Sequence, residues 1–264
     1  MAVYRDVFRF RELFLHLFRR DLEVRYRGSV LGLLWTLINP LILMAAYTLV
    51  FSILLKAESI EYFPLFVAVG LLPWAFFGTS IQTSTTTLVG HAYLVKQVRF
   101  PRQLLPLSVI GTNLVTFFAM LVVILPFTLV LIPETRTTFW AALPMIVPLI
   151  AFTAGLSLVV ACANVVFRDV EHLVAALLLP WFFLTPIFYT FETLPGIQGN
   201  DWVGRFLYYA NPFVPLLEAI RDPLFFGEWP RETDVLYAVV AGVVSLALGA
   251  LVFRRIDDQL AAEL

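Results

Sequence analysis

The chain has 264 residues, of which 60% are hydrophobic and 14% are charged, and its formal net charge is −1. Soluble domains are about 45–50% apolar and about 25% charged, so the apolar excess indicates a protein that crosses a membrane several times. The near-neutral charge gives no sign of a nucleic-acid partner, and we expect none. Cys162 is the only cysteine, which excludes an intrachain disulfide and a cysteine-based metal cluster.

Residues 1–29 are predicted to form a cytoplasmic segment whose main element is an amphipathic helix over residues 4–27. Apolar side chains recur on one side of this helix, at Val7, Phe10, Phe14, Leu17, Phe18 and Leu22. The opposite side is polar, and the end of the helix carries Arg19, Arg20, Glu23, Arg25 and Arg27. Such a helix either lies in the plane of the lipid headgroups or packs its apolar side on other protein, and we favour the first.

Apolar stretches long enough to cross about 30 Å of hydrocarbon fill most of residues 30–264, which we predict to form a single transmembrane domain. Helices are expected over residues 30–55, 63–89, 105–132, 139–167, 173–190 and 235–253. The first of them contains Asn39-Pro40, where the proline removes a backbone donor and should kink the helix. The predicted fold is therefore an all-α membrane protein with about six transmembrane helices.

The segment between the fifth and sixth predicted spans differs from the rest of the chain. Residues 192–222 contain charges and two apolar pieces that are too short to cross a bilayer, divided by Asn211-Pro212. Short apolar helices of this kind are usually re-entrant or interfacial. We therefore predict short helices there that either re-enter the membrane or lie at its outer surface.

Lysine and arginine are distributed unevenly between the two sides of the predicted spans. With the N-terminus inside, 13 of the 18 lie on the cytoplasmic side. Five lie outside, namely Lys56, Arg136, Arg205, Arg221 and Arg231. The positive-inside rule then places both termini in the cytoplasm. The three histidines, His16, His91 and His172, fall at the cytoplasmic edge and are too far apart in sequence to form a local metal motif.

Ionisable residues are missing from the interior of the predicted spans, which disfavours a carrier driven by a proton gradient, although a sodium site built from carbonyls stays open. No G-x-x-x-x-G-K-[ST] phosphate-binding loop is present, so ATP-driven transport would need an ATPase on another chain. A passive scramblase is an alternative. A membrane-bound glycan-modifying enzyme is another, and its outer-side acids could come only from Asp201, Glu218 and Asp222.

Six stretches carry a resemblance to a known family. They are RRDLEVRYRGSVLGLLWTLINPLILMAAYTLVF, GLLPWAFFGTS, VKQVRFPRQLLPLS, NVVFRDVEHLV, TPIFYTFETLP and YYANPFVPLLEAIRD. In this order they resemble the membrane subunits of ABC-type polysaccharide exporters, which move O-antigen, capsular polysaccharide or teichoic acid chains. The resemblance covers nearly the whole chain, and the set is specific although each piece alone would be weak.

The resemblance implies that two copies of the chain pair with two copies of a separate nucleotide-binding subunit in a bacterial inner membrane. ATP and magnesium would be held by that subunit, and no catalytic residue, metal or cofactor is expected in this chain. The amphipathic helix at residues 8–27 would lie near the ATPase, residues 93–105 would hold a coupling helix and residues 168–172 a second contact. The residues expected to couple to the ATPase are Tyr93, Lys96, Arg99, Phe100, Pro101, Arg102, Arg168 and Asp169.

The resemblance also implies a channel between the two copies, through which a lipid-linked glycan is threaded across the membrane. Residues 192–222 resemble the re-entrant outer helices that close this channel. Aromatic and hydroxyl side chains would line part of it, and the expected residues are Asn39, Tyr47, Trp74, Phe77, Thr83, Trp181 and Tyr189. The implied function is ATP-driven export of a lipid-linked polysaccharide, and O-antigen is the preferred candidate for the substrate. Alternatives are export of teichoic acid, capsular polysaccharide or galactan, or of a drug or lipid by a member of the same superfamily.

Overall fold

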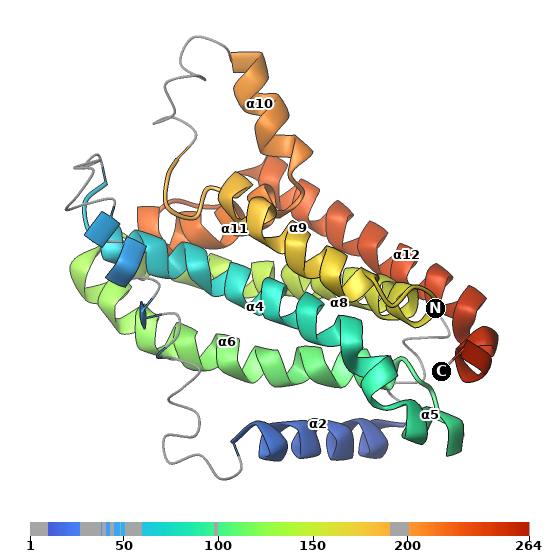
Figure 1. Ribbon diagram of the computed structural model, residues 1–264. Coiled ribbons are helices and arrows are strands. Elements are labelled where there is room, and N and C mark those ends of the chain that lie inside the picture. Colours follow the sequence, from blue (N-terminus) through green and yellow to red (C-terminus); the bar gives the residue numbers. More distant parts are fainter. Residues whose placement is uncertain are drawn as a thin grey trace.

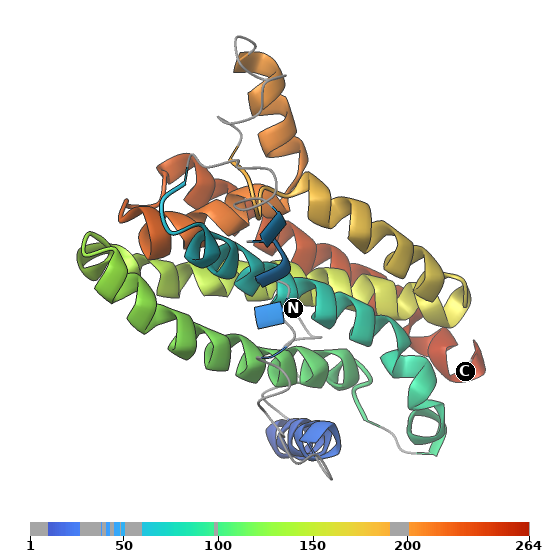
Figure 2. The same cartoon turned by 60° about the vertical axis from the view of Figure 1, so that its left-hand side comes forward.

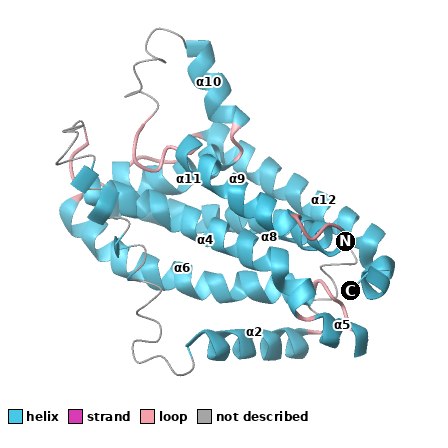
Figure 3. Cartoon of the chain, viewed as in Figure 1, coloured by secondary structure: helices cyan, strands magenta, loops and turns pink. Residues whose placement is uncertain are grey.

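The computed structural model describes residues 10–26, 38, 41–42, 45–47, 49–50, 60–97, 100–190 and 201–263. Within these residues the chain is helical and contains no strand, which confirms the predicted all-α class for this part (Figure 3). Long helices lie side by side in one bundle, and shorter helices gather at its ends (Figure 1). The first predicted span, with its expected kink at Asn39-Pro40, lies almost entirely outside the described residues.

Four helical stretches in the described residues are long and apolar enough to cross a membrane. They are α4 (Phe63–Gly90), α6 (Leu104–Leu131), the stretch Thr135–Val166 and the first part of α12, Glu232–Ile256. The stretch Thr135–Val166 is made of α7 (Thr135–Thr138), the 3₁₀ turn η2 (Phe139–Ala141) and α8 (Ala142–Val166), and α12 as a whole runs Glu232–Glu263. These helices match four of the six predicted spans.

The fifth predicted span is shorter than expected. Helix α9 (Val170–Leu184) has 15 residues and ends where the prediction continued to residue 190. The physical reason is Pro186, because the residue before a proline avoids the helical region, and Thr185 is accordingly extended with φ −96° and ψ 130°. At 1.5 Å per residue α9 is only about 22 Å long, which is less than the hydrocarbon thickness.

Helix α4 lies at the centre of the bundle. In its most apolar stretch 78% of the residues are buried, compared with 28% in α6 and in α12. Phenylalanine, leucine and valine side chains of α4 pack against α6, α8 and α9 to form the main hydrophobic core. The outward surfaces of α6 and α12 are therefore available to lipid or to other protein.

Small residues bring α8 and α12 into close contact. A Cβ atom added to Gly249 would lie 2.5 Å from the carbonyl oxygen of Gly155, and one added to Gly155 would clash with the backbone of Ser245. The hydroxyl of Ser245 donates a hydrogen bond to the carbonyl of Phe152 at 2.7 Å. Close approach over small residues, with a hydroxyl bond across the pair, is a general way in which membrane helices associate.

Helix α2 (Arg11–Tyr26) crosses the bundle near one end. In Figure 2 it is seen end-on while the long helices are seen from the side. Its apolar side is the predicted one, since Leu17 is buried and the rings of Phe14 and Phe18 pack on Gly111 of α6. The side predicted to meet lipid therefore packs in large part on protein.

Candidate functional site

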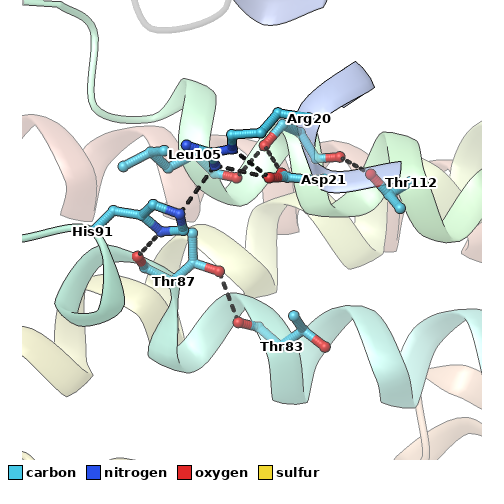
Figure 4. A network of polar contacts seen from close by, with 8 residues as sticks. Arg20, Asp21, Thr83, Thr87, His91, Leu105 and Thr112 are labelled. Atoms are coloured by element: carbon cyan, nitrogen blue, oxygen red, sulfur yellow. Dashed lines mark hydrogen bonds and ion pairs between the residues drawn. The ribbon is translucent and has the colours of Figure 1, made fainter. Parts of the chain in front are cut away.

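A polar network joins α2 to α4 and α6 (Figure 4). Arg20 and Asp21 form an ion pair of 2.8 Å within α2. The second carboxylate oxygen of Asp21 accepts a hydrogen bond from the hydroxyl of Ser108, which is buried in the first part of α6. Nη2 of Arg20 also lies 3.0 Å from Nε2 of His91, the residue that follows α4. The charged end of α2 is thereby attached to both α4 and α6.

The partners of His91 define its tautomer. A guanidinium can only donate, so Nε2 of His91 accepts from Arg20. Nδ1 of the same ring lies 2.9 Å from the carbonyl oxygen of Thr87, and this nitrogen must therefore carry the proton. His91 is neutral in this arrangement and links the last turn of α4 to α2. The sequence interpretation, which treated His91 as an ordinary interface residue, missed this link.

The short helix expected after α4 is present as α5 (Ala92–Gln97). Val95 is buried in the hydrophobic cluster that also contains Leu17 of α2, while Tyr93 is 75% exposed and Lys96 is exposed as well. An element with a buried anchor and a free outer surface is suited to receive a partner.

The loop after α5 contains the rest of the first predicted coupling group. Phe100 is half-buried against the same hydrophobic cluster, and Pro101 and Arg102 are partly buried. Arg99 lies outside the described residues. The loop is therefore anchored to the protein at Phe100, and its coupling role stays a prediction.

The second polar break lies at the same end of the bundle, between α8 and α9 (Figure 1). Arg168 and Asp169 are both exposed in a tight turn. The buried side-chain oxygen of Asn164 accepts a hydrogen bond of 3.0 Å from the backbone nitrogen of Glu171, which holds the first turn of α9. Both predicted coupling segments thus present free side chains at one end of the molecule.

The remaining predicted residues of the interface helix divide by their exposure. Arg19 and Glu23 are exposed, whereas Arg20 is partly buried because it takes part in the network described above. The side chain of Arg25 and the whole of Arg27 lie outside the described part. The polar side of α2 therefore keeps free charges that a neighbour could bind.

One side of α4 is polar and exposed although α4 is a candidate span. Thr79, Gln82 and Thr83 are exposed and Thr86 is partly so, at the spacing of one helix face. We call these four residues the polar stripe. Their hydroxyls are partly satisfied within the helix, for example Thr86 Oγ1 to the carbonyl of Thr83 at 3.3 Å. Because hydrocarbon cannot bond to an amide or hydroxyl, this side is expected to face water or protein.

The aromatic residues predicted to line a channel lie mostly in the core. Phe77 is completely buried and Trp74 nearly so, and both pack against Phe213, at ring-centroid distances of 4.8 and 5.2 Å. Trp181 is partly buried and donates from its indole nitrogen to Asn211 at 2.8 Å. The structure thus gives these three rings a packing role, and Phe77 has no free surface to offer to a channel in this conformation.

The other predicted channel residues keep some free surface. Tyr47 and Tyr189 are partly exposed, and Tyr47 stacks on Phe188 at 5.5 Å. Thr83 is exposed as part of the polar stripe. Asn39 lies outside the described residues. Of the predicted set, Thr83 and the two tyrosines are the residues whose surroundings agree best with a wet path.

Two short helices occupy the segment predicted to be re-entrant. They are α10 (Asp201–Ala210) and α11 (Phe213–Arg221), and they are separated at Asn211-Pro212 as expected. Helix α11 is buried in the end of the bundle, whereas α10 projects from it (Figure 1). The side chain of Asn211 accepts a hydrogen bond from the backbone nitrogen of Phe213 and so starts α11. Whether these helices re-enter a membrane stays a prediction.

Arg221 is the largest departure from the sequence interpretation, which counted it as an outer-loop charge. It is fully buried, pairs with Glu218 at 3.0 Å and donates to the carbonyl of Pro186. Its guanidinium lies 4.3 Å from the ring centre of Phe66 in α4. A buried charge requires such partners, and here they fasten α11 to α4. Gly70 makes room for it, since a Cβ there would lie 2.6 Å from Nη2 of Arg221.

These features define a helical protein with four candidate membrane spans in its described residues, an amphipathic helix tied to one end and a buried charge cluster at the other. The chain belongs to the ABC-2 type transporter family, whose model matches residues 12–225. It is 35% identical over 99% of its length to the O-antigen export system permease protein RfbA of Myxococcus xanthus, of which 98% is covered.

Other relatives agree with this family. The chain is 27% identical to the O-antigen export system permease protein RfbA of Klebsiella pneumoniae, over 95% of this chain and 94% of that protein. It is 22% identical to the polysialic acid transport protein KpsM of Escherichia coli, over 92% of both chains. The resemblance inferred from the sequence is thereby confirmed.

Proposed function

We propose that this chain is the membrane-spanning subunit of an ATP-driven exporter that moves a lipid-linked polysaccharide, first of all an O-antigen, out of the cytoplasm across the inner membrane. The full-length likeness to permeases named for O-antigen export supports the substrate class. The likeness to a polysialic acid transport protein favours a capsular polysaccharide as the second candidate. The structural observation that best supports a role in transport is the polar stripe on α4.

The energy for export comes, in this proposal, from a separate nucleotide-binding subunit that holds ATP and magnesium. Two copies of this chain and two of the ATPase form the complex, and the path runs between the two copies. The exposed side chains Tyr93 and Lys96 of α5, together with Arg168 and Asp169, form the surface that the ATPase contacts. The network of Arg20, Asp21, His91 and Ser108 passes a movement of this surface to α2, α4 and α6.

The polar stripe offers a direct test of the path. Replacing Gln82 by Leu and Thr83 by Val makes this side apolar, so hydroxylated sugars lose their hydrogen-bonding partners and export should fall severalfold while membrane insertion is unchanged. Thr85→Val is the matched control, because Thr85 lies on the buried side of the same helix and bonds only to the carbonyl of Ile81. Normal export by the Gln82/Thr83 variant would show that the path lies elsewhere.

A further inference from the structure

A polar cavity of about 640 Å³ lies between α10 and α11 and belongs to none of the features used so far. Its walls come from α10, α11, the π-helical turn η4 (Asp222–Phe226) and the loop that leads to α12. The volume falls in the range of small-ligand sites, about 300–1,000 Å³. Phe226 of the cavity lining packs on Phe66 near the start of α4, whereas α5 follows the other end of α4. The arginine distribution places the cavity end outside the cytoplasm.

Asp222 at the cavity wall is an unusual residue. It is only 5% exposed, and its carboxyl group makes no hydrogen bond with any residue that the structure describes. Its carboxyl group borders the open cavity and is not among the fully buried side-chain atoms that lack a partner in the described residues, so it is available to bond to a ligand there. Glu218 stands next to it on the cavity wall, where it is held by its ion pair with Arg221.

The remaining lining residues indicate the class of this ligand. Arg205 and Arg231 are exposed beside the cavity and can donate hydrogen bonds, while Glu228 adds a third carboxyl group to the lining. Because Glu218 is already paired with Arg221, two carboxyl groups are left beside two guanidinium groups, and the lining has no excess positive charge to hold an anion such as a phosphate. The two arginines in turn disfavour a cation, and in the described residues no group of acids, histidines or cysteines is arranged to hold a metal.

A polyhydroxylated neutral molecule fits this lining. Each hydroxyl group both donates and accepts, so it can bond to a carboxyl group and to a guanidinium at once. The rings of Tyr209 and Phe226 line the same cavity and offer apolar surface to the C–H face of a sugar. Donors, acceptors and aromatic rings together are the complement of a pyranose ring.

We propose that this outer cavity binds a sugar residue, and that the sugar belongs to the glycan as it leaves the transporter. The source of the sugar rests on the proposed export function, whereas the binding itself rests only on the cavity. Asp222 and Arg205 hold hydroxyl groups from opposite elements, so that a chain emerging from the bundle meets a weak binding site beside α10. Such a site favours outward movement because it holds the leading sugars outside.

The test uses the full chain in lipid nanodiscs and saturation-transfer NMR with free glucose, mannose, galactose, rhamnose and N-acetylglucosamine. We expect at least one of these sugars to bind, and we expect binding about tenfold weaker in Asp222→Ala and in Arg205→Ala, as loss of one hydrogen bond in the site predicts. Arg205 is exposed, so its variant should fold even if the buried Asp222 variant does not. Glu232→Gln is the matched control, since Glu232 is exposed near the cavity but does not line it.

Three results would overturn the proposal: no sugar binds, both variants bind as the unmodified chain does, or inorganic phosphate binds at the cavity and the sugars do not. Export and binding can fail separately. Sugar binding by a chain that exports nothing would contradict the proposed function and leave the cavity site intact. Export by a chain whose cavity takes no sugar would contradict the cavity site alone.

Discussion

The imidazole of His91 bonds to α2 through one nitrogen and to the last turn of α4 through the other. A glutamine can place its amide oxygen where Nε2 accepts from Arg20, whereas an asparagine is too short to do so but can still reach the carbonyl of Thr87. Amide hydrogens of α2 should therefore exchange about three- to tenfold faster in His91→Asn than in His91→Gln. Hydrogen–deuterium exchange measures this, and equal rates in the two variants would remove His91 from the link.

Asp222 makes stability at the outer end depend on pH. Burial first, and then the nearby charge of Glu218, raises the pKa of Asp222 from 3.8 to about 7. Burial likewise raises the pKa of Glu218, against the opposing effect of Arg221. Above pH 4 the unfolded chain has lost the Asp222 proton while the folded chain keeps it up to about pH 7, so stability falls as pH rises through this window.

The expected difference for Asp222 is about 2 kcal/mol between pH 5.5 and pH 8, with the protein more stable at pH 5.5. Glu228, Arg231 and Asp234 also face this carboxyl group and modify the size of the effect. Thermal unfolding in detergent at the two pH values measures it, and Asp222→Asn should reduce the difference. A protein that is more stable at pH 8, or a variant with the same pH dependence, would contradict this assignment.

At the scale of elements, Gly70 decides how closely α11 packs on α4. Gly70→Ala would push a methyl group against the guanidinium of Arg221 and the carbonyl of Ile187, so we expect a loss of about 2 kcal/mol. Gly90→Ala in the same helix meets nothing within 4 Å, and the better helix propensity of alanine should leave stability equal or slightly higher. Unfolding midpoints of the two variants in one detergent compare them, and equal midpoints would mean that Arg221 does not fasten α11.

The elements differ in how far the sequence could predict them. Helices such as α4 and α6 follow from long apolar stretches, and the division of the outer segment follows from Asn211-Pro212. The early end of α9 was also readable, because Pro186 follows Thr185. The burial of Arg221 could not be predicted from the sequence, because its partners Pro186 and Ile187 are 35 and 34 positions away. The bond between Arg20 and His91 spans 71 positions and has no local pattern either.

At the scale of the whole molecule, the features used for function lie at opposite ends of one bundle. Helix α5 lies at the end predicted to face the cytoplasm, and α10 and α11 lie at the other end (Figure 1). His91 directly precedes α5 and bonds to Arg20, whereas Arg221 ends α11 and the cavity is lined by α10 and α11. The polar stripe of α4 lies between them. This order agrees with an exporter that receives energy at one end and releases its substrate at the other.

The central claim is that this chain exports a lipid-linked glycan only when an ATPase partner hydrolyses ATP. The chain can be reconstituted in vesicles with the nucleotide-binding subunit, and movement of labelled lipid-linked O-antigen can be followed with and without ATP. The account predicts ATP-dependent movement that is lost in the Arg99→Glu, Arg102→Glu double variant and kept in Arg136→Glu, a charge reversal outside the coupling segments. Movement that proceeds equally without ATP, or that survives the double variant with ATPase stimulation intact, would contradict it.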